Sequence, residues 1–302
     1  MRIAIAGRGP MADALVRGLA ASPHIVAARL WNGRQAGLAK RLYLRTQETL
    51  HDPARVRTPV VWLDRMDDQE AGLLARHDID LLLSGGFDRI LKPSILRVPK
   101  LGCVNVHPSL LPRFRGPNPF AHVILFGDTE SGVTFHWMDE GVDTGPVIAQ
   151  FRHPVGLRDS GNDLLRNACQ LAETHVARML ESLDQALPQA ASEATHAGWL
   201  SDEQLTFDWN WSAADIDRLI RAAQPYACAR FRHRGKSIFV VRASVEEAIP
   251  DAPPGIVLRS GPRPRIAAVN GSLTILRARV ESPIPFVWPT PWNSPKTGER
   301  ME

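Results

Sequence analysis

The feature that most constrains the fold is a series of short apolar runs separated by stretches in which apolar residues recur at helical spacing. The run from Ile79 to Leu83, apolar except at Asp80, is typical of a central parallel strand that is covered on both faces. Similar runs cover Arg2 to Ala6 and Leu101 to Val106, and a helical pattern from Met11 to Ala20 follows the first. This alternation predicts an α/β, Rossmann-like fold with a mostly parallel sheet.

Two further strands are predicted downstream, Gly132 to Trp137 and Val147 to Arg152, with the turn MDEGVDTGP between them. Apolar residues then recur at helical spacing from about Asn162 to Ala186. Periodicity is lost after that helix. We therefore predict a catalytic domain over residues 1–190 and a linker over 191–204.

Residues 205–302 are predicted to form a second, smaller domain. One helix, Ala213 to Ala223, precedes short strand-like runs with Gly and Pro punctuation, as in a small open β-barrel of the OB-like type. The runs are Ser237–Arg242, Gly255–Leu258, Arg265–Ala268 and Leu273–Ala278.

Composition narrows the class of protein. The 302 residues are 44% hydrophobic and 23% charged, which is typical of a globular protein with a sizeable core. The three cysteines are isolated, so we expect neither a disulfide framework nor a metal site. No apolar run is long enough for a membrane span, and we expect a cytoplasmic protein. The net charge of +4 permits an anionic partner without requiring one.

The chemical centre is predicted around Asn105, His107 and Asp143. Asn105 and His107 stand two residues apart at the end of a predicted strand, so their side chains share a face. Asp143 lies in the Gly-rich turn, from which it can approach the histidine. An amide donor for an oxyanion, an imidazole that moves a proton and a carboxylate that orients the imidazole suit acyl transfer to an amine.

The segments NVHPSLLPRFRGPNP and GVTFHWMDEGVDTGPVIAQ resemble the signature of the 10-formyltetrahydrofolate-dependent formyltransferase family. The resemblance implies that Asn105, His107 and Asp143 are catalytic and that 10-formyltetrahydrofolate is the formyl donor. It also implies that two stretches bind the folate. One is GGFDRIL, residues 85–91, and the other is the turn MDEGV, residues 138–142. The implied folate-binding residues are Gly86, Phe87, Arg89, Ile90, Leu91, Met138, Asp139, Glu140, Gly141 and Val142.

Acceptor contacts are expected near the first turn and around the catalytic strand. The turn GRGPMA begins a helix whose N-terminus suits an anionic group. It also matches a dinucleotide fingerprint. However, no acidic residue follows the next predicted strand, Ile25 to Leu30, to hold a ribose, and this argues against an oxidoreductase. The candidate acceptor-binding residues are Arg8, Gly9, Pro10, Ser109, Arg113, Arg115, Gly116, Asn118 and His136, although solvated or structural roles explain several of them equally well.

The C-terminal part, from LTFDWNWSAADIDRLIRAAQP onward, resembles the second domain of methionyl-tRNA formyltransferases, which also occurs in some sugar formyltransferases. The catalytic strand ends in HPS where the tRNA enzymes usually have HGS, and RGPNPF replaces their RGAAP pattern. The basic segment from Asn32 to Arg57 lacks their usual P-x-G-x-G spacing. We therefore expect a small-molecule amine, such as an amino-sugar nucleotide or an amino acid derivative.

Three alternatives stay open. The first is methionyl-tRNA as the acceptor, the second is hydrolysis of formyltetrahydrofolate, and the third is a non-catalytic folate-binding module. A homodimer is a further expectation.

Overall fold

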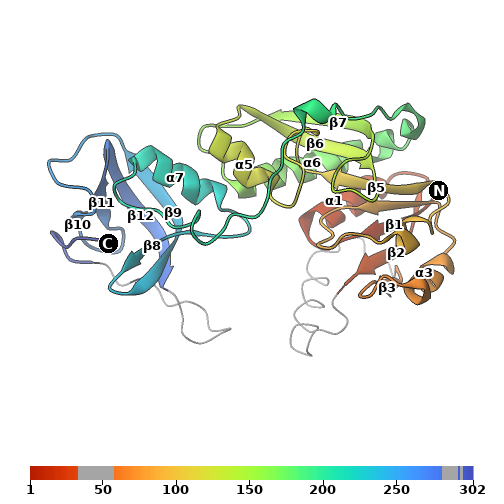
Figure 1. Cartoon of the computed structure of the whole chain (residues 1–302), viewed down its shortest axis with the longest axis horizontal. Coiled ribbons are helices and arrows are strands. Elements are labelled where there is room, and N and C mark those ends of the chain that lie inside the picture. The colour runs from red at the N-terminus through yellow and green to blue at the C-terminus, as the bar shows by residue number, and fades with distance from the viewer. Residues whose placement is uncertain (33–57, 281–291, 293–294, 302) are drawn as a thin grey trace. The chain divides into compact units, whose positions relative to one another are not determined.

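The computed structural model describes residues 1–32, 58–280, 292 and 295–301 (Figure 1). The chain divides into two compact units. Unit 1 comprises residues 1–119, 130–155 and 164–197, and unit 2 comprises residues 120–129, 156–163 and 198–302. The basic segment from Asn32 to Arg57, which lacks the P-x-G-x-G spacing of the tRNA enzymes, lies outside the described residues except for Asn32.

Unit 1 is built on a seven-stranded sheet, in the described residues, with the order β3-β2-β1-β4-β5-β6-β7. The strands β1 to β5 run parallel, whereas β6 is antiparallel to both β5 and β7. Their bounds are β1 Arg2–Ala6, β2 Ile25–Trp31, β3 Val60–Trp62, β4 Leu81–Ser84, β5 Gly102–His107, β6 Glu130–Trp137 and β7 Val147–Pro154. The fold class predicted from the alternating apolar runs is confirmed.

The helices of unit 1 begin where the sequence provides a start signal. Pro10 opens α1 (Pro10–Leu19), where its fixed φ suits the first helical turn, and the Asp67 side chain accepts from the Glu70 amide at the start of α3 (Asp68–Ala75). The other helices are α4 Pro93–Leu96, α5 Pro119–Phe126 and α6 Gly161–Met179, of which α5 and the first residues of α6 fall mainly in unit 2.

The long helix ends earlier than the periodicity predicts. The structure ends α6 at Met179 and continues into the short 3-10 helix η1 (Leu183–Gln185), whereas apolar spacing extends the pattern to Ala186. The indole Nε1 of Trp137 donates to the Leu183 carbonyl at 3.3 Å, a tertiary hydrogen bond that local spacing does not encode. A second 3-10 helix, η2 (Ala191–Glu193), lies in the stretch without periodicity.

Unit 2 contains a five-stranded antiparallel sheet, among the described residues, with the order β10-β11-β12-β9-β8. Its elements are α7 Ala213–Ala222, β8 Ala229–His233, β9 Lys236–Glu246, β10 Val257–Arg259, β11 Arg265–Ala268 and β12 Gly271–Val280. Only β8 has no counterpart among the strand-like runs predicted from the sequence. Arg234 and Gly235, both with positive φ, form the tight turn between β8 and β9.

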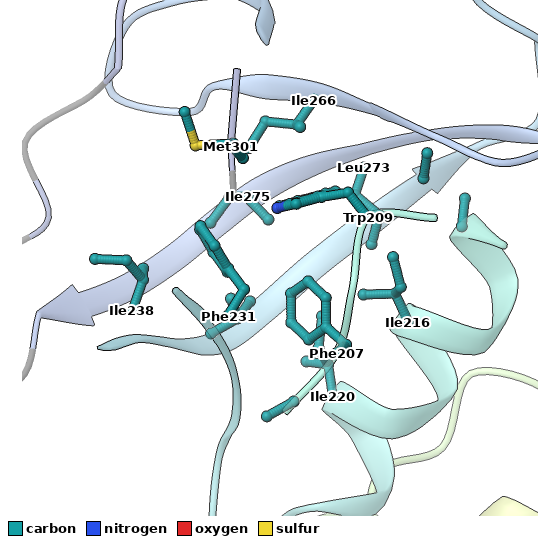
Figure 2. Packing of buried hydrophobic residues seen from close by; sticks show 14 of the residues in the cluster. Phe207, Trp209, Ile216, Ile220, Phe231, Ile238, Ile266, Leu273, Ile275 and Met301 are labelled. Carbon is teal, nitrogen blue, oxygen red and sulfur yellow. The ribbon is translucent and has the colours of Figure 1, made fainter. Parts of the chain in front are cut away.

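The core of unit 2 packs one face of α7 against the sheet around large aromatic side chains (Figure 2). Trp209 and Phe231 are nearly or fully buried, and their ring centroids lie 5.1 Å apart. Ile216 and Ile220 reach this cluster from α7, four residues apart and hence on one helix face. This core is entirely apolar except for the indole nitrogen of Trp209.

Candidate active site

Two neighbouring strands of unit 1 place four polar side chains on one region of the sheet. On β5, Asn105 and His107 are separated by one residue, and β6 pairs His136 opposite Asn105 and Thr134 opposite His107. His107 and His136 are buried. The strand positions of Asn105 and His107 therefore agree with the sequence prediction, and the antiparallel partner adds His136 to the same cluster.

The turn between β6 and β7 brings Asp143 onto this cluster. Its two carboxylate oxygens face different partners: Oδ1 lies 3.2 Å from Asn105 Nδ2 and 3.5 Å from His136 Nε2, and Oδ2 lies 3.4 Å from His107 Nδ1. The backbone N–H of Gly116 donates to Oδ2 at 2.8 Å. The three residues predicted to be catalytic are thus brought together.

The hydrogen-bond partners fix the orientation of the Asn105 amide. A carboxylate only accepts, so Nδ2 faces Asp143. His136 Nδ1 lies 2.8 Å from the Trp137 carbonyl and donates to it, so in the neutral form of the ring Nε2 accepts the second Asn105 hydrogen at 3.2 Å. Both amide hydrogens of Asn105 are therefore occupied by protein groups.

The same reasoning places the proton of His107. Its Nε2 lies 2.8 Å from the Phe114 carbonyl, which can only accept, so the neutral ring carries its hydrogen on Nε2. Burial lowers the pKa of His107 and outweighs the opposing attraction of Asp143. The ring is therefore neutral at pH 7, and Nδ1 is the nitrogen that can take up a proton.

Asp143 remains ionised. Burial by itself raises its pKa, but the attraction that His107 and His136 exert when their rings are protonated, together with the Gly116 N–H, holds the pKa well below the usual range of a carboxyl group. The bonds from Gly116 and Asn105 act on the carboxylate whatever the charge of His107. A proton taken up by His107 Nδ1 would thus form an ion pair with a carboxylate already in place.

The loop after β5 is held by side chains of β6 and β7. Thr134 Oγ1 donates to the Ser109 carbonyl at 2.6 Å and accepts from the Leu111 amide at 3.2 Å. Gln150 Nε2 donates to the Leu111 carbonyl at 2.6 Å. Sequence reasoning did not assign Thr134 and Gln150 a role in the site, although Thr134 shares the alternation of His136 along the strand.

Several predicted acceptor-binding residues are used by the protein itself. Ser109 is fully buried and its hydroxyl donates to the Arg113 carbonyl at 2.7 Å, so its expected acceptor contact does not fit the structure. Arg115 is 9% exposed and binds Gln189. Asn118 is also buried, whereas Arg113 is exposed with its guanidinium 4.7 Å above the Phe114 ring.

The two segments predicted to bind folate border one cluster of buried residues. Phe87 and Met138 both pack against the cluster that contains Leu82 and Cys103. Gly86, Arg89, Glu140 and Gly141 are exposed, as are the apolar side chains of Ile90 (69%) and Val142 (45%). Leu91 is buried, and the Asp139 carboxylate accepts from the Gly141 amide and the Thr144 hydroxyl within the turn. Exposed apolar side chains are a suitable surface for an aromatic ring, and the assignment of these residues to folate stays a prediction.

The first turn lies at the same edge of the sheet as the folate segment. Ala6 is paired with Ser84, and a Cβ added at Gly7 would lie 2.2 Å from the Gly85 carbonyl oxygen. Arg8 stacks its guanidinium 5.4 Å from the Trp31 ring and 5.7 Å from the Trp62 ring. Gly9 and Pro10 follow at the start of α1, so all three predicted acceptor residues of this turn stand at the carboxyl ends of the strands.

The most consequential residue missed by sequence reasoning is Gln189. It lies in the stretch without periodicity, yet its side chain bonds to Arg115 and to the backbone of the Asp143 turn. A single glutamine in a Pro- and Ala-rich segment has no spacing signal that distinguishes it from solvent-exposed loop residues.

Neither a metal site nor a membrane-spanning helix is found in residues 1–32, 58–280, 292 and 295–301. Among these residues, His, Cys, Asp and Glu side chains form no group of three or more suited to a metal ion. No helix in the same ranges is long and apolar enough to cross a membrane.

Comparison with known proteins finds similarity along nearly the whole chain. Residues 1–180 match the formyl transferase family and residues 200–293 match its C-terminal domain. The methionyl-tRNA formyltransferase of Acidiphilium cryptum is 35% identical over 264 residues, which cover 85% of this chain and 85% of that protein.

Solved structures share the fold at lower identity. HypX from Aquifex aeolicus, determined with tetrahydrofolic acid, superposes with a TM-score of 0.69 at 18% identity, over 93% of this chain and 44% of HypX. This chain therefore spans less than half of HypX. An N-formyltransferase from Helicobacter canadensis, determined with folinic acid and dTDP-3-aminofucose, gives a TM-score of 0.60 at 18% identity, over 91% and 98% of the two chains.

Proposed function

Since this chain belongs to the formyl transferase family, we propose that it transfers the formyl group of 10-formyltetrahydrofolate to the amino group of methionyl-tRNA. The observation that supports this acceptor is the similarity to the Acidiphilium cryptum enzyme, which extends over most of both proteins. It favours the tRNA alternative over the small-molecule amine that the sequence departures predict.

The residues of the two folate-binding segments are assigned to hold the donor. Gly86 to Leu91 provide backbone groups and the exposed Ile90 side chain, and Met138 to Val142 provide the facing turn. When bound, the donor supplies a formyl carbon that the acceptor amine attacks.

His107 is assigned as the group that takes the proton of the attacking amine and returns it to the folate nitrogen, which leaves as its bond to the formyl carbon breaks. Its Nδ1 is unprotonated at pH 7 and lies 3.4 Å from Asp143 Oδ2, so the positive charge that forms on the ring is met by a carboxylate. The Phe114 carbonyl holds the opposite ring nitrogen in place. Asp143 therefore orients and stabilises the imidazolium without itself gaining a proton.

Asn105 is assigned to donate to the oxygen on which negative charge develops. Because both of its hydrogens already have partners, donation to substrate requires one bond to be exchanged. The bond to the His136 ring nitrogen is the one assigned to exchange, since the bond to the Asp143 carboxylate is charge-assisted. Exchange at His136 keeps Asp143 anchored during transfer.

A small-molecule amine remains the second candidate acceptor. The observation in its favour is the HPS and RGPNPF sequence around Pro108 and Pro117, where the tRNA enzymes resemble one another in HGS and RGAAP. Arg113 is exposed beside this loop, and a guanidinium recognises an anionic small molecule as well as tRNA phosphate.

The test uses the purified full chain with 10-formyltetrahydrofolate labelled in the formyl group. Initiator methionyl-tRNA, dTDP- and UDP-linked amino sugars and free amino acids are offered separately, and His107→Ala is the inactive control. Label transferred to methionyl-tRNA supports the proposal. Transfer only to an amino sugar or amino acid overturns the acceptor, and release of formate without any amine indicates the hydrolase. If no label leaves the folate under any condition, the proposed function is wrong.

A further inference from the structure

The segment from Leu187 to Ala197 runs across both loops that form the candidate site. At one end, Leu187 and Val147 exchange two backbone hydrogen bonds of 2.8 Å just after the Asp143 turn. At the other end, the backbone N–H of Arg115 donates to the Thr195 carbonyl at 2.8 Å, and the Arg115 carbonyl accepts from the Ala197 N–H at 2.7 Å. The segment thus connects the turn that carries Asp143 with the loop that follows His107.

Gln189 stands between these two attachments and uses all of its hydrogen-bonding groups. Its Oε1 accepts from Arg115 Nε at 3.1 Å and from Arg115 Nη2 at 2.7 Å. Its Nε2 donates to the carbonyls of Asp143 at 2.9 Å and Gly145 at 2.8 Å. A guanidinium only donates and a carbonyl only accepts, so the amide has one orientation.

The backbone that Gln189 holds is conformationally demanding. Asp143 has a φ of 54°, in the left-handed region that non-glycine residues seldom occupy. Gly145 has no room for a side chain, since a Cβ there would lie 1.9 Å from the Trp137 carbonyl oxygen. Such a conformation persists only where its surroundings fix it, and both carbonyls of this stretch are fixed by Gln189.

The Arg115 side of the contact reaches the same carboxylate. Gly116 follows Arg115 and donates its N–H to Asp143 Oδ2 at 2.8 Å. Arg115 is itself only 9% exposed, and Gln189 Oε1 accepts two hydrogen bonds from its guanidinium. Asp143 is therefore tied to the 115–116 loop twice, once through its own side chain and once through Gln189.

We propose that Gln189 is a positioning residue for the transfer reaction, which fixes the 143–145 backbone against the 115–116 loop and so aims the Asp143 carboxylate between Asn105 and His107. The proposal rests on the proposed function, because it assigns Gln189 to the support of Asp143. Its substitution should slow transfer without weakening binding of the formyl donor.

A glutamate substitution separates positioning from general stability. In Gln189→Glu, the side chain still accepts from Arg115 and gains charge attraction, but the two donors to Asp143 and Gly145 are replaced by an acceptor that faces two carbonyls. We expect a melting temperature close to that of the wild type and a kcat reduced on the order of tenfold to a hundredfold, since small displacements of a catalytic group have effects of this size. The KM for the formyl donor should be unchanged.

The experiment measures kcat, KM and melting temperature for Gln189→Glu and Gln189→Ala, with Gln185→Ala as the matched control on the exposed η1 turn. NMR titration of the His107 ring gives a readout that needs no substrate. Because Asp143 raises the pKa of His107, displacement of Asp143 should lower that pKa further in both Gln189 variants but not in Gln185→Ala.

Wild-type kcat together with an unchanged His107 titration in Gln189→Glu would overturn the proposal. So would a loss of activity that only follows the loss of folded protein in Gln189→Ala. If the wild-type chain transfers formyl to no amine, the proposed function fails, and the His107 titration still decides whether Gln189 positions Asp143.

Discussion

Two buried regions, the β5–β6 face of unit 1 and the core between α7 and the sheet of unit 2, differ in the groups that they enclose. On the β5–β6 face of unit 1, Asn105, His107, His136 and Asp143 are enclosed together and bonded to one another. In the core of unit 2, α7 and the sheet enclose aromatic and aliphatic side chains, and the one buried indole nitrogen, that of Trp209, has no partner among the described residues (Figure 2). The first region places charge and protons, and the second contributes stability through burial.

This difference predicts where a substitution acts. Replacing a group of the polar cluster should change the reaction more than the fold, because its neighbours are positioned by strands and loops with their own hydrogen bonds. Replacing a core side chain of unit 2 should change the fold more than the chemistry.

The largest expected effect is that of His107→Ala on formyl transfer. Removal of a positioned general base slows a reaction by roughly 10²- to 10⁴-fold. Binding of the formyl donor, measured by calorimetry, should persist, because the segments assigned to the donor do not include His107. His77→Ala, two residues beyond α3, is the matched control and should retain full activity. Near-wild-type transfer by His107→Ala would mean that the polar cluster on the β5–β6 face does not carry out the reaction.

Phe231→Ala should have the next largest effect, on stability. Its ring is fully buried and contacts the rings of Phe207, Trp209 and Trp292. Truncation of a buried Phe typically costs about 3–5 kcal/mol of unfolding free energy. Urea unfolding measures the loss, and Phe126→Ala, 70% exposed, serves as the control. An equal loss of stability in both variants would mean that the unit 2 core is not the source of the effect. A changed NMR titration of His107 in Phe231→Ala would mean that this core also affects the polar cluster.

The rate of formyl transfer should fall at acidic pH as the buried His107 ring becomes protonated. Burial lowers the pKa of His107 below its ordinary 6.5, so the neutral ring persists at pH 6.5 and is lost only at more acidic pH. Transfer should then fall about tenfold for each pH unit below that pKa. Stability should decline in the same direction, since below pH 6.5 the unfolded chain binds a proton there that the folded protein does not.

Asp143→Asn sharpens this expectation. The carboxylate opposes the effect of burial, so its removal should lower the His107 pKa further, as followed by NMR titration of the ring. A rise of that pKa in Asp143→Asn would mean that Asp143 does not act on His107 as the 3.4 Å contact implies.

The sequence predicts the strands of unit 1 and the neighbourhood of the candidate site because these depend on local patterns. Asn105 and His107 share a face through simple alternation, and the Gly-rich turn indicates that Asp143 lies in a loop. The burial of Ser109 and the contacts of Gln189 depend on segments far apart in the chain. No spacing rule reports that residue 189 meets residues 115, 143 and 145, so this support was visible only in three dimensions.

The smallest effects concern two helical glycines of unit 1 that sequence alone does not distinguish. Gly18 in α1 lies against α6, where an added Cβ would be 2.3 Å from the Glu173 carbonyl oxygen and 2.5 Å from Val176 Cγ1. Gly72 in α3 has open space around the same position.

Replacement by Ala gains up to about 1 kcal/mol of helix propensity at either site. At Gly18, overpacking against backbone typically costs about 1–3 kcal/mol, so the clash should win and Gly18→Ala should lower the urea midpoint. Gly72→Ala should raise the free energy of unfolding by about 1 kcal/mol or less, and the urea midpoint should rise with it. Both variants should keep wild-type kcat, because neither glycine touches the polar cluster. Equal shifts of the urea midpoint in Gly18→Ala and Gly72→Ala would show that helix propensity outweighs packing between α1 and α6. A fall in kcat without unfolding would show that helix packing in unit 1 affects the reaction.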